Sequence, residues 1–286
     1  MLLRILMIAV MMIGCGKLKV PKAANSIALT SSVSQWVAGQ CVDITLSLSQ
    51  SGSAFVVPGT TTAQIGLSGN LSGIRFYETG ADCAAATGAV TITTVASATS
   101  SKTFYANSTA SGALTLTTRL AGYLGTPITV SLEGTQEFTV YAATPVNFMF
   151  ALQSASSTDL NGADSVSAAT AGCTPYFIYF KDTYGNVVSS TDFTTLYTAT
   201  FAGLNLVVNR DAGDATIAMA DYGSSNCSGT NVVPSGGAKT QNNAFTTYPA
   251  PFSIDPTGSV GGTTIIFSHA LTGITPNPTF TLNVSP

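Results

Sequence analysis

The sequence offers few side chains that could carry out catalysis. His269 is the single histidine, and it lies in the alternating stretch 264–270, which is typical of a strand and lacks the G-x-S-x-G context of a serine nucleophile. Glycoside hydrolysis needs two carboxylates across a cleft. The glutamates Glu78, Glu133 and Glu137 stand in no recognisable motif of that kind. We therefore predict no catalytic residue, no enzymatic activity and no cofactor.

Metal binding has one candidate group of ligands. Asp211, Asp214 and Asp221 are the most closely spaced acidic residues, with Asn209 nearby, and such oxygen atoms could hold Ca²⁺ in a loop. The spacing does not match an EF-hand, so a solvated turn is the favoured interpretation. No two cysteines are close enough in sequence for a zinc cluster or a redox pair. We predict no metal site and keep calcium as the alternative.

Cys15 has a chemistry set by its position after an apolar run. Arg4 precedes the run 5–13, which is shorter than the roughly 20 apolar residues of a transmembrane helix and indicates a signal peptide. The segment Met12-Ile13-Gly14-Cys15 resembles the lipobox of bacterial lipoproteins, in which the cysteine is acylated and becomes the mature N-terminus. The resemblance implies lipidation of Cys15. An ordinary secretory signal is the alternative, and either one exports the chain.

Lipidation implies a location at a membrane. More than one acyl chain, such as palmitate, makes membrane attachment durable, since each buried methylene contributes about 0.8 kcal/mol. We expect a signal peptide at 1–14 and a lipidated tether at 15–25. Gly16 follows the cysteine in place of a retention Asp. By resemblance to Gram-negative sorting, we expect an outer-membrane lipoprotein of the cell envelope that faces the periplasm or the cell surface.

The remaining cysteines are an even set in an oxidising compartment: Cys41, Cys83, Cys173 and Cys227. Four cysteines allow three pairings. Internal similarity favours one of them, because the segment 38–41 is similar to 171–173, and Tyr77 and Tyr222 each precede a downstream cysteine by a few residues. We predict the disulfides Cys41–Cys83 and Cys173–Cys227, each contributing about 4 kcal/mol by closing a long loop.

The composition limits the possible partners. Hydrophobic residues make up 45% of the chain, which is enough for packed cores, but only 8% of residues are charged, so hydroxyl groups rather than ions cover the surface. The net charge is -3, and the few basic residues after the N-terminus are scattered. This pattern excludes the basic footprint that nucleic acid requires.

Alternating side chains indicate strands. Val42, Ile44, Leu46 and Leu48 share one face of the extended segment 42–48. The same alternation recurs in 91–93, 113–117, 128–132 and 280–284. Outside the signal segment, no window of ten or more residues combines good helix formers with an apolar stripe. Gly or Pro also interrupts nearly every stretch of ten residues. We predict an almost entirely β mature chain.

Strands at intervals of roughly 8–12 residues, separated by turn clusters, are typical of β-sandwiches. The internal similarity indicates two of them, at 26–142 and 146–286, on either side of the junction Ala143-Thr144-Pro145. The predicted fold class is therefore all-β, with two tandem sandwich domains. A junction this short implies limited independent motion.

One turn sequence carries a family resemblance. The stretch 181–188 contains Asp182, Gly185 and Asn186 and resembles the D-x-x-G-N-x-V turn of bacterial immunoglobulin-like domains in invasin- and intimin-type adhesins. Gly185 can adopt a positive φ, while Asp182 and Asn186 can bond to turn amides. The corresponding stretch 46–57 of the first repeat lacks the Asp and Asn. The resemblance implies immunoglobulin-like domains of stalks and adhesive tips rather than enzymes.

Aromatic residues supply a candidate binding surface. In the stretch 176–180, Tyr176, Ile178 and Phe180 share one side of a strand, which leaves Phe177 and Tyr179 on the other. There they could stack on a protein or glycan partner, or pack against the first domain. Similarly, Trp36 precedes Cys41, and we expect it in the core near the disulfide, with an interface as the alternative.

The sequence thus favours a cell-envelope lipoprotein that acts as a structural, adhesive or partner-binding module. It would contact the membrane through its lipid and a protein or glycan through its domains. The alternative is a carbohydrate-binding lipoprotein, and less favoured still is a carbohydrate-degrading one, since polarised groups at close range are scarce.

Overall fold

The computed structural model describes most of the chain after the N-terminal segment. The described residues are 23–59, 61–123, 126–127, 132–155, 159–160, 166–169, 173–210, 217–223, 225–227, 233, 236–256, 261–269 and 279–285. The predicted signal peptide and Cys15 lie outside these ranges.

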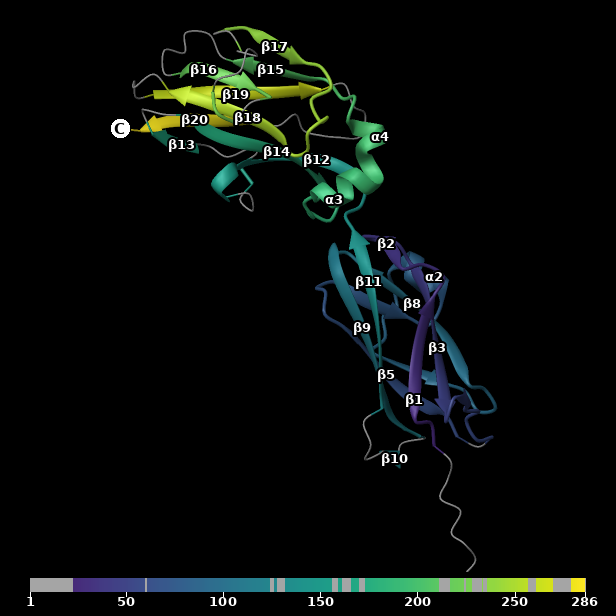
Figure 1. Ribbon diagram of the computed structural model, residues 1–286. Coiled ribbons are helices and arrows are strands. Elements are labelled where there is room, and N and C mark those ends of the chain that lie inside the picture. The colour runs from purple at the N-terminus through teal and green to yellow at the C-terminus, as the bar shows by residue number, and fades with distance from the viewer. Residues whose placement is uncertain are drawn as a thin grey trace, which may run out of the picture.

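The first half of the chain forms two facing sheets, here called the N-terminal sandwich (Figure 1). One sheet has the order β1 (Ser26–Ser31), β3 (Val42–Gln50), β8 (Ser101–Ser108) and β6 (Ile74–Tyr77), with β4 (Ser53–Ala54) paired to β3. The other has the order β2 (Gln35–Val37), β11 (Glu133–Tyr141), β9 (Gly112–Tyr123), β5 (Ala63–Gly69) and β7 (Ile92–Val95), with β10 (Thr126–Pro127) paired to β9. The β2–β11 pair is parallel, and the other pairs of this sandwich are antiparallel.

The second half forms the C-terminal sandwich. Its first sheet has the order β12 (Pro145–Leu152), β14 (Thr174–Asp182), β18 (Ala250–Pro256) and β16 (Ile217–Tyr222). Its second sheet has the order β13 (Val166–Ala169), β20 (Thr279–Ser285), β19 (Gly261–His269), β15 (Leu206–Arg210) and β17 (Ala238–Gln241). Again one pair, β13–β20, is parallel.

The two sandwiches share one topology. In each, the first two strands go to different sheets, and the second of them pairs in parallel with the last strand. In each, the strand at the far edge of the first sheet (β6, β16) precedes the strand at the far edge of the second (β7, β17) along the chain. This antiparallel two-sheet arrangement is immunoglobulin-like. The predicted fold class, two tandem immunoglobulin-like sandwiches, is confirmed.

Period-two burial holds each sandwich together. In β3, alternate residues from Val42 to Leu48 are at most 3% exposed, as the alternation predicted. In β14, Tyr176, Ile178 and Phe180 are fully buried. The buried apolar side chains form two separate clusters, one for each sandwich. The expected strand at 128–132 falls almost entirely outside the described residues.

The described chain is mostly β, as predicted, but one helical segment was not foreseen. Besides the short helix α2 (Gly80–Ala85) and the single turn η1 (Gln153–Ala155), a continuous helical segment runs through α3 (Ser190–Asp192), η2 (Phe193–Tyr197) and α4 (Thr198–Phe201). Its threonines have low helix propensity, which hid it from the sequence analysis.

Two other signals do explain the segment 190–201. The Ser189 side chain accepts from Asp192 N, and the Asp192 side chain accepts from Ser189 N, which is a capping box. Phe193, Tyr197 and Phe201 recur at helical spacing and are all buried in the C-terminal core. Burial of this apolar stripe therefore overrides the weak propensity of the exposed threonines.

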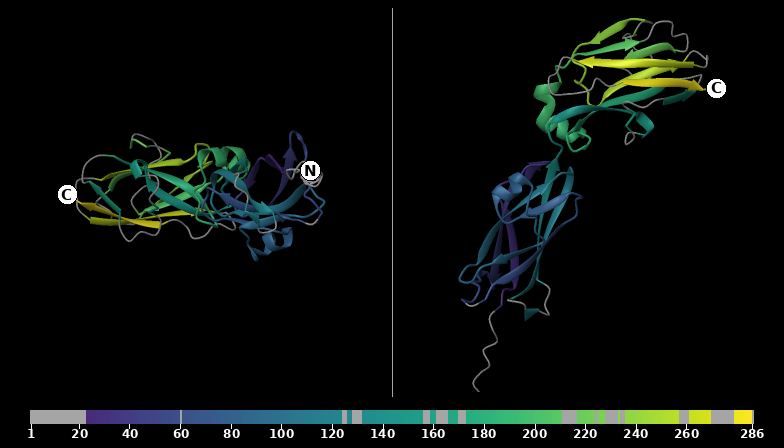
Figure 2. Two further views of the ribbon diagram at one scale, coloured as in Figure 1. Left: turned by 90° about the horizontal axis from the view of Figure 1, so that it is seen from below. Right: turned by 180° about the vertical axis from the view of Figure 1, so that it is seen from behind.

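The sandwiches lie end to end (Figure 1). The chain enters the N-terminal sandwich at its outer end, beside β1 and β10, and leaves at the opposite end through β11. The α3–α4 segment faces that junction, whereas β20 ends on the far side of the C-terminal sandwich. The right-hand view of Figure 2 shows the same arrangement from behind, with the strands of the two sandwiches running in different directions.

The capping box makes a testable contribution to stability. Ser189→Ala removes the oxygen that accepts from Asp192 N at 3.0 Å, and we expect the free energy of unfolding to fall by about 1 kcal/mol in chemical denaturation. The control is Thr195→Ala, an exposed position of the same segment, where the change should stay within about 0.5 kcal/mol. Equal losses in both variants would contradict a specific role for the cap.

Candidate functional site

The junction between the sandwiches is fixed by side chains of the C-terminal sandwich. After β11, Ala142 N donates to Asp192 Oδ2 at 3.1 Å, and Ala143 N donates to Asp182 Oδ2 at 2.8 Å. The Tyr197 hydroxyl donates to Ala142 O at 2.7 Å. Ala142 is itself fully buried in the C-terminal core. The connecting backbone is thus part of a packed structure, not a free linker.

Asp182 is the centre of this junction. It is 3% exposed, and its carboxylate accepts four hydrogen bonds. Oδ1 accepts from Tyr184 N and Asn186 N, both at 2.8 Å, while Oδ2 accepts from Ala143 N and from Asn186 Nδ2 at 2.7 Å. Charge-assisted bonds of this number compensate for burying the carboxylate. Gly185 has φ +84, so the turn forms as its sequence predicted.

Asn186 extends the same turn across to the N-terminal sandwich. Its Nδ2 donates to Thr109 O at 2.8 Å, and its Oδ1 accepts from Ser111 N at 3.2 Å. Both partners lie in the turn between β8 and β9. One carboxamide therefore joins the Asp182 carboxylate to the backbone of the preceding sandwich.

Tyr184, at the tip of the turn, makes a second contact with the N-terminal sandwich. Its ring lies against Gly39, where an added Cβ would overlap the ring, and Gly39 also has φ +83. Asn107 Nδ2 donates to Gly39 O at 2.6 Å, and Gly39 N donates to Ser108 O at 2.8 Å. A glycine is thus required at position 39 both by the backbone conformation and by the neighbouring ring.

The Tyr197 hydroxyl keeps its proton at the junction. Burial, and then the negative charges of Asp192 and Asp182, raise the pKa of Tyr197 to about 12. The hydroxyl therefore stays neutral well beyond physiological pH and remains a donor to Ala142 O.

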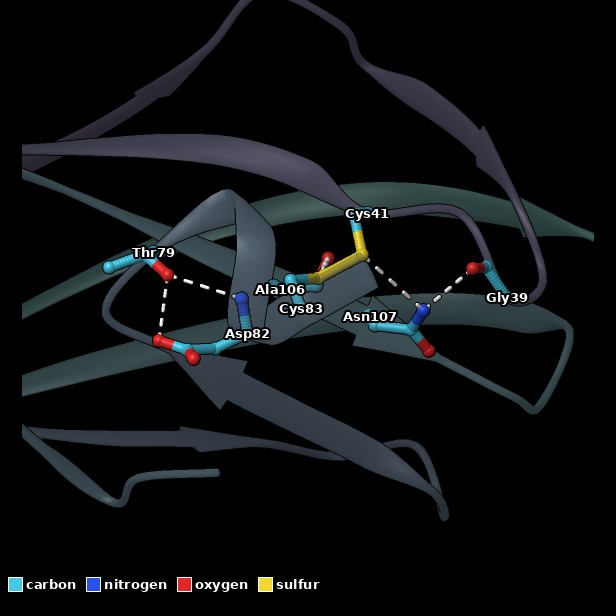
Figure 3. Close-up of a disulfide and its surroundings, with 7 residues drawn as sticks. All are labelled: Gly39, Cys41, Thr79, Asp82, Cys83, Ala106 and Asn107. Carbon is cyan, nitrogen blue, oxygen red and sulfur yellow. Dashed lines mark hydrogen bonds between the residues drawn. A yellow bond between two sulfur atoms is a disulfide. The ribbon is translucent and has the colours of Figure 1, made fainter. Parts of the chain in front are cut away.

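The first disulfide braces the N-terminal side of this contact (Figure 3). Cys41 and Cys83 are bridged, with Cα atoms 5.9 Å apart, and the bridge joins the start of β3 to α2. Thr79 caps α2 by accepting from Asp82 N at 3.1 Å. Asn107 Nδ2, besides bonding Gly39 O, lies 3.9 Å from Cys41 Sγ. The bridge therefore holds the loop that contacts Tyr184.

The second disulfide occupies the equivalent place in the C-terminal sandwich. Cys173 and Cys227 are bridged, with Cα atoms 5.7 Å apart, and they join the start of β14 to the segment after β16. Cys227 N donates to the buried Ser253 Oγ at 3.1 Å. Both pairs are those that internal similarity favoured. Chain entropy gives about 4 kcal/mol for each closed loop.

The predicted aromatic surface lies on β14. Phe177 and Tyr179 are half-buried on the side of the strand opposite the core, and their ring centroids are 6.1 Å apart at 84°. The ring of Tyr248 lies 6.1 Å from that of Tyr179. The structure thus brings the two predicted residues together in one edge-to-face pair, and binding by this pair stays a prediction. Trp36, by contrast, is a core residue, 2% exposed and stacked on Phe138.

No catalytic arrangement is formed by the described residues. Glu78 pairs with Lys102 at 2.7 Å, and Glu133 lies 3.7 Å from Arg119. Glu137 lines an open hollow of about 400 Å³ over β2, β9 and β11, and no second carboxylate lines that hollow. Another hollow, of about 340 Å³, is lined mainly by apolar residues of β5, β6 and the segment 89–91 that precedes β7.

Metal ligands and membrane helices can be assessed only in part. Within the ranges given above, no three His, Cys, Asp or Glu side chains gather to hold a metal ion. Asp211 and Asp214 lie outside those ranges, and the side chains of Asp221 and His269 are not described. Among the helices of the described residues there is none that could span a bilayer.

Part of this site was predictable from the sequence. Asp182, Gly185 and Asn186 were predicted to form a turn, and the four cysteines were predicted to form two disulfides. The contacts of Asn186 with the other sandwich were not predicted, nor were the roles of Asp192 and Tyr197. The capping box of Ser189 and Asp192 was the signal that could have located these last two residues.

Comparison with known proteins gives similarity at the level of solved structures. No protein-family model matches the chain, and no curated protein matches it. The similar structures include immunoglobulin-like adhesins of the invasin and intimin type.

Three of them illustrate the degree of similarity. The Escherichia coli adhesin FdeC is 14% identical with a TM-score of 0.33, and the match covers 92% of this chain and 65% of that one. InvD of Yersinia pseudotuberculosis is 15% identical with a TM-score of 0.35, covering 90% and 67%. Invasin, described as a bacterial integrin-binding protein, is 13% identical with a TM-score of 0.37, covering 92% and 40%. This chain therefore spans about two thirds or less of their length.

The Asn186 contacts can be tested separately from the fold. Asn186→Ala removes the two bonds to the turn between β8 and β9, and we expect a wider range of angles between the sandwiches in small-angle X-ray scattering, with a loss of about 1–2 kcal/mol in stability. Thr183→Ala, an exposed position of the same turn, is the control and should scatter like the unmodified chain. Identical scattering of both variants would show that Asn186 does not restrain the junction.

Proposed function

We propose that this chain is an envelope-anchored structural or adhesive module, in which two rigidly connected domains, 26–142 and 146–286, hold a binding surface away from a membrane. Cys15 carries the lipid anchor, residues 15–25 form the tether, and the outer membrane is the location. The ligand is a protein or a glycan. No catalytic step is part of this function.

The observation that carries the proposal is the hydrogen-bonded junction. A display module has to transmit position from its anchored end to its distal end, which requires a stiff connection between domains. Here the connecting backbone is bonded by Asp182, Asp192 and Tyr197. The chain enters at one end of the stack and the second sandwich lies at the other (Figure 1).

An exported address is supported by the disulfides. Bridges such as Cys41–Cys83 and Cys173–Cys227 persist in oxidising compartments and are rare in the cytosol. The surface, with few charges and many hydroxyl groups, suits a weakly ionic ligand rather than a polyanion.

Carbohydrate binding is the second candidate, and the pair Phe177 and Tyr179 favours it. Aromatic side chains on the outer face of a sheet can stack against sugar rings. Their half-buried, edge-to-face arrangement offers part of each ring. Hydrolysis is not proposed, because the described glutamates form no carboxylate pair across a cleft.

The anchor is tested by mass spectrometry of the native protein. We expect the mature chain to begin at Cys15 with added acyl mass and to contain no free thiol, since the other four cysteines are bridged. Cys15→Ser should abolish the acyl mass and leave the signal peptide uncleaved, while both disulfides still form. If the mature chain begins at another residue and carries no acyl mass, the lipid anchor is refuted. The display role would then depend on the binding experiment with Phe177 and Tyr179.

The binding surface is tested with Phe177→Ala and Tyr179→Ala. If these rings contact a ligand, each variant loses adhesion or glycan retention while its free energy of unfolding falls by no more than about 2 kcal/mol, because the side chains are only half-buried. Tyr105→Ala, at a half-buried aromatic of β8, is the control and should keep binding. A large loss of stability with unchanged binding would assign both rings to packing instead.

A further inference from the structure

The edge strand β7 of the N-terminal sandwich leaves backbone groups unpaired. β7 is the last strand of its sheet and pairs only with β5, from Ile92 opposite Gly66 to Val95 opposite Ala63. It is accessible, because Ile92 is 51% exposed and Thr94 is also exposed. An accessible edge of this kind is a template for another strand.

The hydrogen-bond register shows which groups point outward. Leu67 N donates to Thr91 O at 2.8 Å, so Thr91, Thr93 and Val95 direct their backbone groups toward β5. Ile92 and Thr94 alternate with them and therefore direct N–H and C=O away from β5. Within the described part of the chain, no backbone group bonds to these four atoms. The free edge is thus short but well defined.

The equivalent edge of the other sandwich is protected differently. β17 occupies the same place in the C-terminal sandwich and carries Lys239 in its short ladder with β15. A lysine on an edge strand discourages pairing with another chain. The β7 region has no such residue, since no charge occurs between Asp82 and Lys102. The two edges of one repeated fold therefore differ in the feature that blocks association.

We propose that β7 pairs antiparallel with β7 of a second copy of this chain, about a twofold axis that passes beside Thr93. Ile92 of each copy then exchanges its N–H and C=O bonds with Thr94 of the other copy. The pairing extends the sheet β2-β11-β9-β5-β7 continuously into the second molecule. It does not depend on the lipid anchor or on Phe177 and Tyr179.

The chemistry of the strand favours a second copy as the partner. An antiparallel edge is complementary to itself, because a twofold axis places donors of one copy opposite acceptors of the other. The outward pair would be Ile92 against Thr94, a favourable β-branched combination. No like charges would meet, since the segment has none. The interface is small, so the association is weak and needs a high local concentration.

Photo-crosslinking of the purified chain at high protein concentration tests this pairing independently of the proposed anchor. A photoreactive side chain at Ala96, which is exposed next to the free edge, should give an adduct with the mass of two chains. The same side chain at Thr240, on β17, is the control position and should give none. The proposal would be overturned if the Ala96 position gave no two-chain adduct. It would also be overturned if both positions gave equal amounts of the two-chain adduct.

Variants at Thr94 distinguish an effect on pairing through β7 from an effect on folding. Thr94→Pro removes a backbone N–H that has no partner within the described structure, so each sandwich should fold, with both disulfides formed. Loss of this donor in both copies should lower the yield of the two-chain adduct at least about tenfold. Thr94→Ala keeps the N–H and should retain the adduct. An undiminished adduct in Thr94→Pro at an unchanged melting temperature would exclude pairing through this edge.

Discussion

The backbone amides at the junction, one buried and one partly buried, place the strongest constraint on this protein. Where β11 leads into β12, Ala142 and Ala143 have no strand to bond to, and unsatisfied amides there would cost about 1–3 kcal/mol each. Two carboxylates from separate elements satisfy them, Asp182 at the end of β14 and Asp192 in the helical segment. Both elements must be folded for the junction to form. The relative placement of the sandwiches is therefore coupled to the packing of the second one.

The features that follow from local rules could be predicted from the sequence. Alternation in 42–48 predicted the buried face of β3, because period two leaves a strand only one way to face a core. The turn at Asp182 was also predictable, since Gly185 supplies the conformation and the carboxylate reaches nearby amides. The cysteine pairing followed from the repeat, which the shared strand order of the two sandwiches explains.

Features that depend on distant parts of the chain could not be predicted in this way. The helical segment 190–201 has threonines that disfavour a helix, and burial of Phe193 and Phe201 in the core offsets that preference. Likewise, nothing near Asn186 indicates that it bonds to Thr109. The corresponding turn of the first repeat makes a different contact: Ser51 N donates to Asn25 Oδ1 in the segment before β1.

The parallel pairs β2–β11 and β13–β20 have a mechanical consequence. In each sandwich, an early strand and the last strand run side by side in the same direction. A pull between the two ends of either sandwich draws these strands in opposite senses along their length. Their hydrogen bonds are then loaded together in shear, and must break at once instead of opening one after another. A sandwich built in this way resists tension applied between its two ends.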